Sequence, residues 1–307
     1  MNIFVSGGCG FIGTHLIKKL NQVGHSVTIF DNFSNSSKTE NIKKQKKNLQ
    51  IIEGDIRNFE ELSKSIIGHD LVIHLAAKIS VTESLKNPNE TYEVNVKGTE
   101  NILKACKKNS IKKIIALSSA AVYGNNDNPN HKFRENDKTI PISPYGISKI
   151  KMEESIQKSS KTDKNNSIVL RLFNVYGKGQ TDEYAGVISK FIDKIKNNES
   201  LIIFGEGNQT RDFIYIDDLV ELITNIINQN FKKKFEVYNI GNGKPCKIID
   251  LANLMIKISP SKNKIIFKEK REGEIVHSIA AIDKAKKELN FNPKISLEVG
   301  IKKLLLL

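Results

Sequence analysis

Residues 2–13 read NIFVSGGCGFIG, and this stretch decides the fold. A short apolar run, Asn2–Ser6, is followed by glycines at positions 7, 8, 10 and 13, and an amphipathic segment begins at Phe11. Glycines permit a tight turn and let the backbone approach a phosphate, while the amino end of a helix offers N–H donors and a positive dipole end. The stretch therefore predicts a strand, a turn and a helix that bind a dinucleotide. A plain strand–turn–helix without a ligand is the alternative.

Acidic side chains end the next two expected strands. Asp31 follows Ser26–Phe30, where a carboxylate can accept hydrogen bonds from the adenosine ribose and repel a 2′-phosphate. This position predicts NAD rather than NADP. Asp55 follows the run Leu49–Glu53. It could contact the adenine, or it could equally cap the helix that follows.

Short apolar runs alternate with amphipathic segments through the first half of the chain. The expected strands are Asn2–Ser6, Ser26–Phe30, Leu49–Glu53, Asp70–Leu75, Lys113–Ser118 and Ile168–Phe173, and the expected helices are Phe11–Val23, Glu60–Ile67, Pro88–Asn109 and Tyr145–Lys158. Such alternation is typical of parallel strands covered by helices on both faces. We therefore predict an α/β fold: a Rossmann-type, doubly wound parallel sheet with a smaller C-terminal α/β substrate domain.

The pattern changes after about Phe173, where the expected elements become less regular. Further helices are expected at Val187–Lys196, Asp217–Asn228, Ile248–Ile258 and Leu297–Leu306. We predict a dinucleotide-binding domain over residues 1–173 and a second domain over residues 174–307. Glu236–Ile240 looks like a strand that could return to the first sheet, and the polar stretch Asn125–Lys138 is expected to be a surface loop.

Composition narrows the class of protein. The 307 residues are 39% hydrophobic and 27% charged, which is typical of a globular protein. Cys9, Cys106 and Cys246 lie far apart, so a disulfide scaffold and a zinc ribbon are excluded, and the histidine spacing predicts no metal site. No apolar run approaches the roughly 18–20 residues of a membrane span. No signal peptide is apparent, so we expect a cytoplasmic protein without a membrane partner.

The chain is strongly basic, with 48 Lys and Arg against 34 Asp and Glu, a formal net charge of +14. Its lysines are scattered in pairs and triplets without interleaved aromatic residues. This distribution favours a solvated lysine-rich surface over a nucleic-acid interface, so we expect no nucleic-acid partner. A positive field would still attract an anionic substrate.

Tyr145 and Lys149 are four residues apart in an expected helix, so they lie on one face. A nearby ammonium and a positive nicotinamide ring both favour the phenolate, which makes Tyr145 a candidate general base for oxidation of a hydroxyl. Ser119 comes at the end of the fifth expected strand, at the sheet edge where ligands bind. It could share the substrate hydroxyl with Tyr145. The alternatives are a surface Tyr–Lys pair and a serine that bonds to its own turn.

Several motifs in order resemble the extended short-chain dehydrogenases/reductases, and within them the nucleotide-sugar epimerase/dehydratase family. They are GGCGFIG (7–13), DN (31–32), GDIR (54–57), HLAA (74–77), NVKGT (95–99), SSAAVYG (118–124), PYGISK (144–149), RLFNVYG (171–177) and GNQTRDFIYIDD (207–218). The resemblance covers nearly the whole chain. It implies an NAD-binding Rossmann domain, a nucleotide-sugar-binding domain and a homodimer formed through the helices Pro88–Asn109 and Tyr145–Lys158.

The resemblance also implies the site residues. The catalytic set is Ser119, Tyr145 and Lys149. The NAD site is lined by Gly7, Gly10, Phe11, Ile12, Gly13, Asp31, Asn32, Asp55, Ile56, Ala76, Ala77, Asn95, Tyr145, Lys149 and Phe173. The UDP-sugar is bound by Ser119, Tyr145, Asn174, Arg211, Arg271 and Ser278. A guanidinium fork suits a diphosphate, although Arg211 next to Asp212 could instead form a surface ion pair.

The residues after Ser119 separate the reactions of the family. Its members oxidise C4 of the sugar to a 4-keto intermediate, but 4,6-dehydratases carry an Asp-Glu pair where this chain has Ala120 and Ala121, and decarboxylases usually carry a Glu. Alanine cannot transfer a proton, so the resemblance implies NAD-dependent 4-epimerisation of a UDP-hexose, UDP-glucose to UDP-galactose. Ser278 is small, which makes UDP-N-acetylglucosamine an alternative substrate. Another dehydratase or reductase, or an NAD-binding sensor without chemistry, is less favoured.

Overall fold

The computed structural model describes residues 1–34, 48–163, 165–180, 186–231, 233–259, 263–270 and 275–305. The chain forms two compact units, and three separate segments build each of them. The first unit comprises Met1–Val122, Ser143–Arg171 and Val220–Tyr238. The second comprises Tyr123–Ile142, Leu172–Leu219 and Asn239–Leu307.

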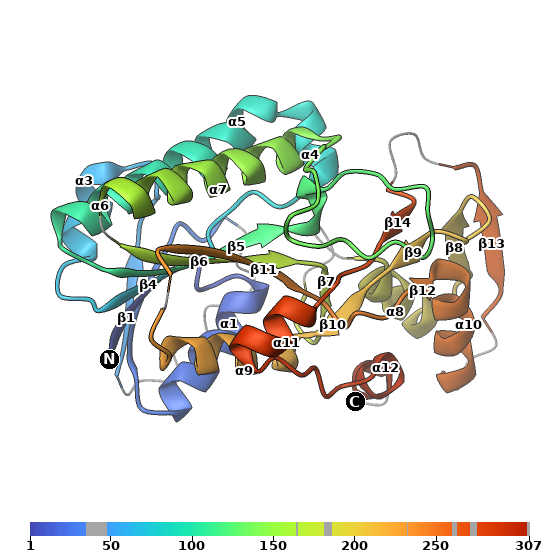
Figure 1. Ribbon diagram of the computed structural model, residues 1–307. Coiled ribbons are helices and arrows are strands. Elements are labelled where there is room, and N and C mark those ends of the chain that lie inside the picture. Colours follow the sequence, from blue (N-terminus) through green and yellow to red (C-terminus); the bar gives the residue numbers. More distant parts are fainter. Residues whose placement is uncertain are drawn as a thin grey trace. The chain divides into compact units, whose positions relative to one another are not determined.

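A seven-stranded parallel sheet forms the centre of the first unit (Figure 1). Its order is β11-β6-β5-β4-β1-β2-β3. The strands are β1 (Asn2–Ser6), β2 (Ser26–Asp31), β3 (Leu49–Glu53), β4 (Leu71–His74), β5 (Lys113–Ser119), β6 (Asn166–Leu172) and β11 (Phe235–Ile240). The predicted Rossmann-type α/β fold is confirmed, and the strand expected at Glu236–Ile240 joins this sheet beside β6. Strand order changes direction at β1, which lies between β2 and β4; ligands bind at such a point, beyond the carboxyl ends of the strands.

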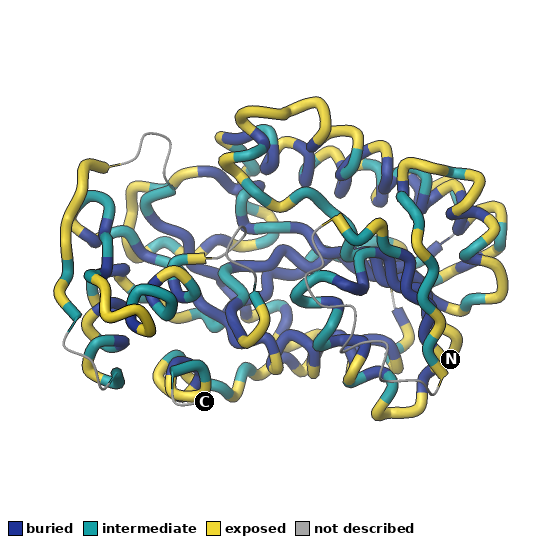
Figure 2. Tube along the Cα trace, turned by 180° about the vertical axis from the view of Figure 1, so that it is seen from behind, coloured by how far each residue is buried: buried dark blue, intermediate teal, exposed yellow. Residues whose placement is uncertain are grey.

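Helices cover both faces of this sheet (Figure 1). The face that carries α1 (Phe11–Gln22) also carries most of α9 (Ile216–Ile227), and the opposite face carries α3 (Phe59–Ser65), α4 (Val81–Lys86), α5 (Pro88–Tyr92), α6 (Gly98–Lys108) and α7 (Pro144–Thr162). Beneath the second group lies a core that includes Phe4, Phe30, Leu62, Ile102 and Met152. Figure 2 shows the strands as largely buried and the outer helix faces as exposed.

The segment expected as one helix over Pro88–Asn109 is helical without a gap from Pro88 to Lys108, but its middle is π-helical. α5 ends at Tyr92, residues Glu93–Lys97 form a π-helical turn, and α6 begins at Gly98. Such turns insert one extra residue and are frequent at functional sites. Apolar periodicity does not reveal an inserted residue, which is why the sequence predicted one helix. α4 was not expected either.

The second unit is built from short elements. Its strands are β7 (Asn174–Tyr176), β8 (Leu201–Phe204), β9 (Thr210–Arg211), β10 (Phe213–Tyr215), β12 (Cys246–Lys247), β13 (Ile265–Lys268) and β14 (His277–Ser278), and its helices include α8 (Val187–Lys196), α10 (Ile248–Ile258), α11 (Asp283–Leu289) and α12 (Leu297–Leu305). They form a β7–β10 pair, a β8–β13 pair and a three-stranded sheet, β12-β9-β14. These strands were too short to predict, whereas α8, α10 and α12 begin where the sequence placed them.

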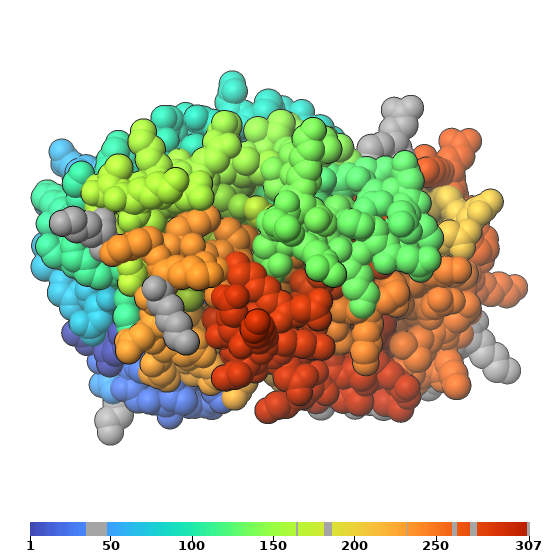
Figure 3. Space-filling model, viewed as in Figure 1, coloured from blue at the N-terminus to red at the C-terminus, as the bar shows by residue number. Residues whose placement is uncertain are grey.

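The segment 123–142 is a long, mostly irregular stretch, in agreement with the loop predicted at Asn125–Lys138. Phe133 donates its N–H to the Ile279 carbonyl (2.8 Å), and its own carbonyl accepts from the Ala281 N–H (2.8 Å). In Figure 3 this segment, in green, borders the red-orange C-terminal part of the same unit. Across the described residues, the helices are all too short or too polar to traverse a lipid bilayer.

Candidate active site

The loop between β1 and α1 accepts only glycine at two positions. Gly7 has a φ of +72°, and a Cβ there would lie 2.5 Å from the Ala76 backbone nitrogen. A Cβ on Gly13 would overlap the Gly8 carbonyl, so this glycine lets α1 pack directly on the loop. The first turn of α1 therefore lies close to the carboxyl ends of β1 and β4.

The amino end of α1 fits a pyrophosphate. Its N-cap is Gly10, which has an extended backbone and provides no side-chain cap, and the first turn carries no acidic residue. The nearest atom to a Cβ on Gly10 would be the Gly7 carbonyl oxygen, at 3.5 Å, so the loop is open there. The N–H groups of a first turn bind anions when no side chain caps them. Phe11, Ile12 and Gly13 are thus suited to hold the pyrophosphate of NAD.

Asp31 at the end of β2 is tied to the same loop. Its carboxylate accepts hydrogen bonds from the N–H groups of Cys9 and Phe33, both at 2.9 Å. Burial raises the pKa of Asp31, and these two hydrogen bonds lower it. The carboxylate is held at the sheet edge where a ribose would lie if the loop binds a dinucleotide.

Asp55 is held by its neighbours rather than by the helix that follows. Arg57 donates to it through Nε (2.9 Å) and Nη2 (2.6 Å), and Asn32 donates through Nδ2 (3.0 Å). The bond from Arg57 is the main reason why the pKa of Asp55 falls to about 2. Asn58 caps α3 instead, by accepting from the Glu61 N–H. The structure thus decides against the helix-cap alternative for Asp55.

Asn95 lies in the π-helical turn and fixes the segment that follows β4. Its Oδ1 accepts from the Lys78 N–H (2.8 Å), and its Nδ2 donates to the Lys78 carbonyl (2.9 Å) and to Ser148 Oγ (2.9 Å). Ala76 and Ala77 precede Lys78, and the Ala76 backbone adjoins Gly7. Ala76, which was predicted to line the NAD site after β4, therefore lies directly against the glycine loop.

Ser119, Tyr145 and Lys149 come together at the carboxyl end of β5. Ser143 caps α7 by accepting from the Gly146 N–H, which places Tyr145 in the first turn of the helix. The Ser119 hydroxyl lies beside the Tyr145 phenol. Its Oγ also accepts from the Ala121 N–H (3.2 Å), so the serine bonds to its own turn as well. Lys149 donates from Nζ to the Leu117 carbonyl (2.8 Å), and Nζ lies 6.0 Å from the centre of the Tyr145 ring.

Burial sets the electrostatics of this group. Tyr145 and Lys149 are only 8% and 4% exposed. Burial raises the pKa of Tyr145, while the adjacent Ser119 hydroxyl lowers it. Burial lowers the pKa of Lys149 to about 8, and the Glu153 carboxylate opposes this shift. An ammonium beside a phenol in a buried site favours the phenolate, so this group can move a proton at a ligand hydroxyl.

His74, at the end of β4, is packed in the interior of the first unit. Its Nδ1 hydrogen-bonds with Ser6 Oγ (2.7 Å) and its Nε2 with Thr99 Oγ1 (2.9 Å). Burial lowers its pKa to about 3, so the ring is neutral. The part of the chain that the structure describes contains no cluster of His, Cys, Asp and Glu able to hold a metal ion.

The predicted substrate residues of the second unit gather around β9. Arg211 lies opposite Cys246 on β12 and Ser278 on β14, so the three side chains share one face of the small sheet. The Arg211 guanidinium donates to the carbonyls of Thr210 (2.9 Å) and Val276 (3.3 Å).

Phe173 directly precedes β7, and Asn174 is the first residue of this strand. Asn174 donates from its N–H (2.9 Å) and Nδ2 (3.3 Å) to the Asp212 carbonyl, and Phe173 donates its N–H to Ile240 (2.9 Å). The Asp212 carboxylate is fully buried and accepts from the N–H groups of Asn242, Gly243 and Ala280. Arg271 lies outside the described residues.

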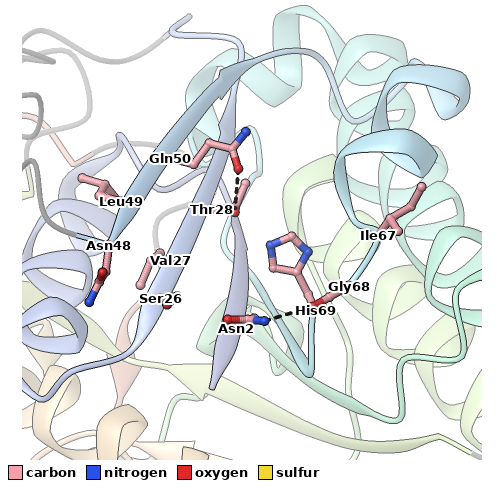
Figure 4. A pocket seen from close by; sticks show the side chains of 10 residues that line it. All are labelled: Asn2, Ser26, Val27, Thr28, Asn48, Leu49, Gln50, Ile67, Gly68 and His69. Atoms are coloured by element: carbon pink, nitrogen blue, oxygen red, sulfur yellow. Dashed lines mark hydrogen bonds between the residues drawn. The ribbon is translucent and has the colours of Figure 1, made fainter.

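A separate hollow of about 460 Å³ lies at the other end of the large sheet (Figure 4). Asn2, Thr28, Gln50 and His69 line it, with neighbouring residues of β1–β3 and of the turn before β4. These are the amino ends of the strands, opposite to the glycine loop. The hollow is therefore distinct from the candidate active site.

Sequence reasoning missed the buried residues that surround the catalytic group. Glu153 accepts from Ser118 Oγ (2.5 Å) and from Arg171 Nη2 (2.7 Å), and the Glu153 and Arg171 side chains are each 8% exposed. The available signal was the spacing, since Glu153 follows Lys149 by four residues on the same helix face.

Comparisons with known proteins find relatives over nearly the full length of the chain. The model of the NAD dependent epimerase/dehydratase family matches residues 3–241. A protein of Methanocaldococcus jannaschii, provisionally named a UDP-glucose 4-epimerase, is 40% identical over 306 residues, which are 98% of this chain and 96% of that protein. A crystal structure of UDP-glucose 4-epimerase with UDP-glucose, from Thermotoga maritima, is 34% identical with a TM-score of 0.93, covering 100% of this chain and 98% of that one.

A UDP-N-acetylglucosamine 4-epimerase from Methanobrevibacter ruminantium M1, in complex with UDP-N-acetylmuramic acid, is equally similar. It is 34% identical with a TM-score of 0.92, and the match covers 99% of this chain and 97% of that one. The chain is therefore similar over its full length to epimerases that differ in the sugar they are named for.

Proposed function

Because the chain belongs to the NAD-dependent epimerase/dehydratase family, we propose that it interconverts the C4 epimers of a UDP-hexose, UDP-glucose and UDP-galactose, through a transient 4-keto sugar. The observation that carries this proposal is the buried group Ser119–Tyr145–Lys149, followed directly by two alanines. NAD, the cofactor of the family, would accept a hydride from C4 of the sugar and return it to the opposite face.

The residues of this chain supply the proton transfer. Tyr145 removes the proton of the C4 hydroxyl during oxidation and restores it after the keto sugar has turned over. Lys149 Nζ lies 6.0 Å from the centre of the Tyr145 ring. While Lys149 is protonated, its positive charge stabilises the Tyr145 phenolate. Ser119, which lies beside Tyr145, would share the same sugar hydroxyl.

The 3₁₀ turn Ala120–Val122, directly after Ser119, favours epimerisation over elimination. Loss of the C6 hydroxyl needs an acid and a base beside the keto sugar, and neither Ala120 nor Ala121 can exchange a proton. With no such groups at these positions, the keto sugar would be reduced again. The proposed outcome is therefore the C4 epimer.

Ser278 favours a second candidate substrate. It is a small residue on β14, and it shares a sheet face with Arg211. If Arg211 binds the diphosphate, Ser278 lies near the sugar, where a small side chain leaves room for an N-acetyl group. UDP-N-acetylglucosamine is then epimerised as well as UDP-glucose.

Product analysis tests both candidates. The purified protein is incubated with UDP-glucose and, separately, with UDP-N-acetylglucosamine, without added NADH, and the products are identified by proton NMR. We expect the C4 epimer of at least one sugar. Formation of UDP-galactose alone would show that another residue closes the pocket to the acetylated sugar. No epimer from either sugar, even with added NAD, would contradict the proposal.

We further propose that the protein is a homodimer. Leu85 on α4, Tyr92 on α5 and Ile147 on α7 are large apolar residues that are 63%, 40% and 47% exposed, and the three helices pack against one another in the first unit. Exposed apolar side chains gathered on neighbouring helices are typical of an interface. A second copy of this chain would cover them.

A further inference from the structure

Three residues of α7 contact three consecutive residues of β5. Lys149 donates to the Leu117 carbonyl, Glu153 accepts from Ser118 Oγ, and Tyr145 lies beside Ser119. The helix residues are spaced by four, so they form one line along one face. These three contacts fix the position of α7 against the end of β5 over two helical turns. Glu153 makes the contact that lies farthest along the helix.

Glu153 is itself held from β6. Arg171 donates to its two carboxylate oxygens through Nε (3.0 Å) and Nη2 (2.7 Å), and both side chains are almost completely buried. A buried carboxylate needs such a partner, because an uncompensated charge in a protein interior is strongly unfavourable. The pair as a whole is neutral, and its negative end, Glu153, is fixed one helical turn from Lys149.

Few charged or titratable groups face Lys149. Among the described residues, Tyr145 and Glu153 face Lys149 from its own helix, and His74 faces it from β4. Arg171 on β6 acts only through its bond to Glu153. The contact with β5 is the uncharged Leu117 carbonyl, and His74 is neutral. Glu153 is therefore the nearby group whose charge favours the ammonium form of Lys149.

We propose that Glu153, fixed by Ser118 and Arg171, is a positioning residue that keeps Lys149 protonated and the Tyr145–Lys149 face of α7 in register with β5. The inference rests on the proposed function, because it deepens the role of the Tyr145–Lys149 pair. Glu153 touches no reacting atom in this account. It acts through Lys149, whose charge stabilises the phenolate.

Two variants separate this role from simple structural support. Glu153→Gln keeps the shape of the side chain and removes its charge. The double variant Glu153→Met with Arg171→Met removes both charges together, and replacing a buried ion pair by apolar residues of similar volume is often neutral for stability. Glu154→Gln is the matched control: it makes the same charge change on the next residue, whose side chain is 56% exposed and paired with Lys151.

The readout is the pH dependence of epimerisation. We expect the alkaline limb of kcat to move to lower pH by roughly one to two units in Glu153→Gln, from the loss of a unit charge one helical turn away. The double variant also loses the opposite charge of Arg171, so its limb should move in the same direction by less. KM should change by less than about threefold, since binding groups are untouched, and Glu154→Gln should retain the wild-type profile. A wild-type pH profile in Glu153→Gln, or in a folded double variant, would overturn the proposal.

A second readout needs no substrate. The sequence contains no Trp, so the near-ultraviolet absorbance of tyrosinate can be followed, with Tyr145→Phe in each background as the reference. We expect the Tyr145 phenolate to form at higher pH in Glu153→Gln, because Lys149 has already lost its proton; an unchanged titration would contradict the proposal. If the wild-type protein epimerised no UDP-hexose, the proposed function would fail, yet this titration would still decide the role of Glu153.

Discussion

At the scale of single residues, the candidate site is governed by the cost of burying titratable groups. Tyr145, Lys149 and His74 are each less than a tenth exposed, and burial pushes each toward its neutral form. Hydrogen bonds and one carboxylate then decide which group carries charge. Lys149, with a pKa near 8, is the group whose protonation changes in the physiological range.

Tyr145→Phe removes the hydroxyl that moves the proton and leaves the ring in place. We expect kcat to fall by about 10²–10⁴-fold, the usual contribution of a positioned acid or base, with little change in melting temperature. Steady-state kinetics and thermal unfolding measure the two effects. A loss of less than about threefold would exclude Tyr145 as the base.

His74→Asn tests the neutral buried imidazole. The pKa of His74 is about 3 in the folded protein against an ordinary value of 6.5, so only the unfolded chain binds a proton between these values. Wild-type stability therefore falls as pH falls below 6.5. The free energy of unfolding of the wild type, relative to His74→Asn, should decrease by roughly 2 kcal/mol from pH 7.5 to pH 5. Urea titrations at both pH values measure this difference, and a constant difference would contradict the assignment.

At the scale of elements, sequence periodicity predicted the strands of the large sheet and their main helices well. It failed where local structure depends on tertiary contacts. The π-helical turn forms where Asn95 bonds to Lys78 and Ser148, and two-residue strands such as β9 and β14 carry too few residues to show a pattern. The site motifs could be recognised because their residue types are dictated by chemistry. For Glu153 the sequence offers only its spacing of four from Lys149, because its partners Ser118 and Arg171 are distant in sequence.

The contact between α1 and its glycine loop gives a prediction for this element. Gly13→Ala would place a methyl group against the Gly8 carbonyl, so either the helix or the loop must shift. We expect a loss of stability of about 1–3 kcal/mol, as for overpacking elsewhere, and loss of copurifying NAD. Gly186→Ala is the control, because its Cβ would meet nothing closer than 4.0 Å. Thermal unfolding measures the stability of each variant, and chromatography of the nucleotide released on denaturation measures its bound NAD. If Gly13→Ala retained NAD, the role given to the loop would be contradicted.

At the scale of the whole molecule, the proposed dimer can be tested at its most exposed apolar side chain. Leu85→Glu would bury a carboxylate in the interface, which is unfavourable without a partner. We expect the variant to be monomeric by light scattering at concentrations where the wild type is dimeric. Ile266→Glu, on β13 of the second unit, makes the same kind of change at another exposed apolar residue and should leave the mass unchanged. A monomeric wild type would contradict the dimer.

The most direct test of the central claim follows the hydrogen at C4. UDP-glucose deuterated at C4 is incubated with the purified protein in ordinary water without added cofactor, and the UDP-galactose formed is examined by NMR. Hydride removal and return predict that the product keeps its deuterium at C4 and that no NADH accumulates. Replacement of the deuterium by solvent hydrogen, or a product that has lost the C6 hydroxyl, would contradict epimerisation by oxidation and reduction at C4.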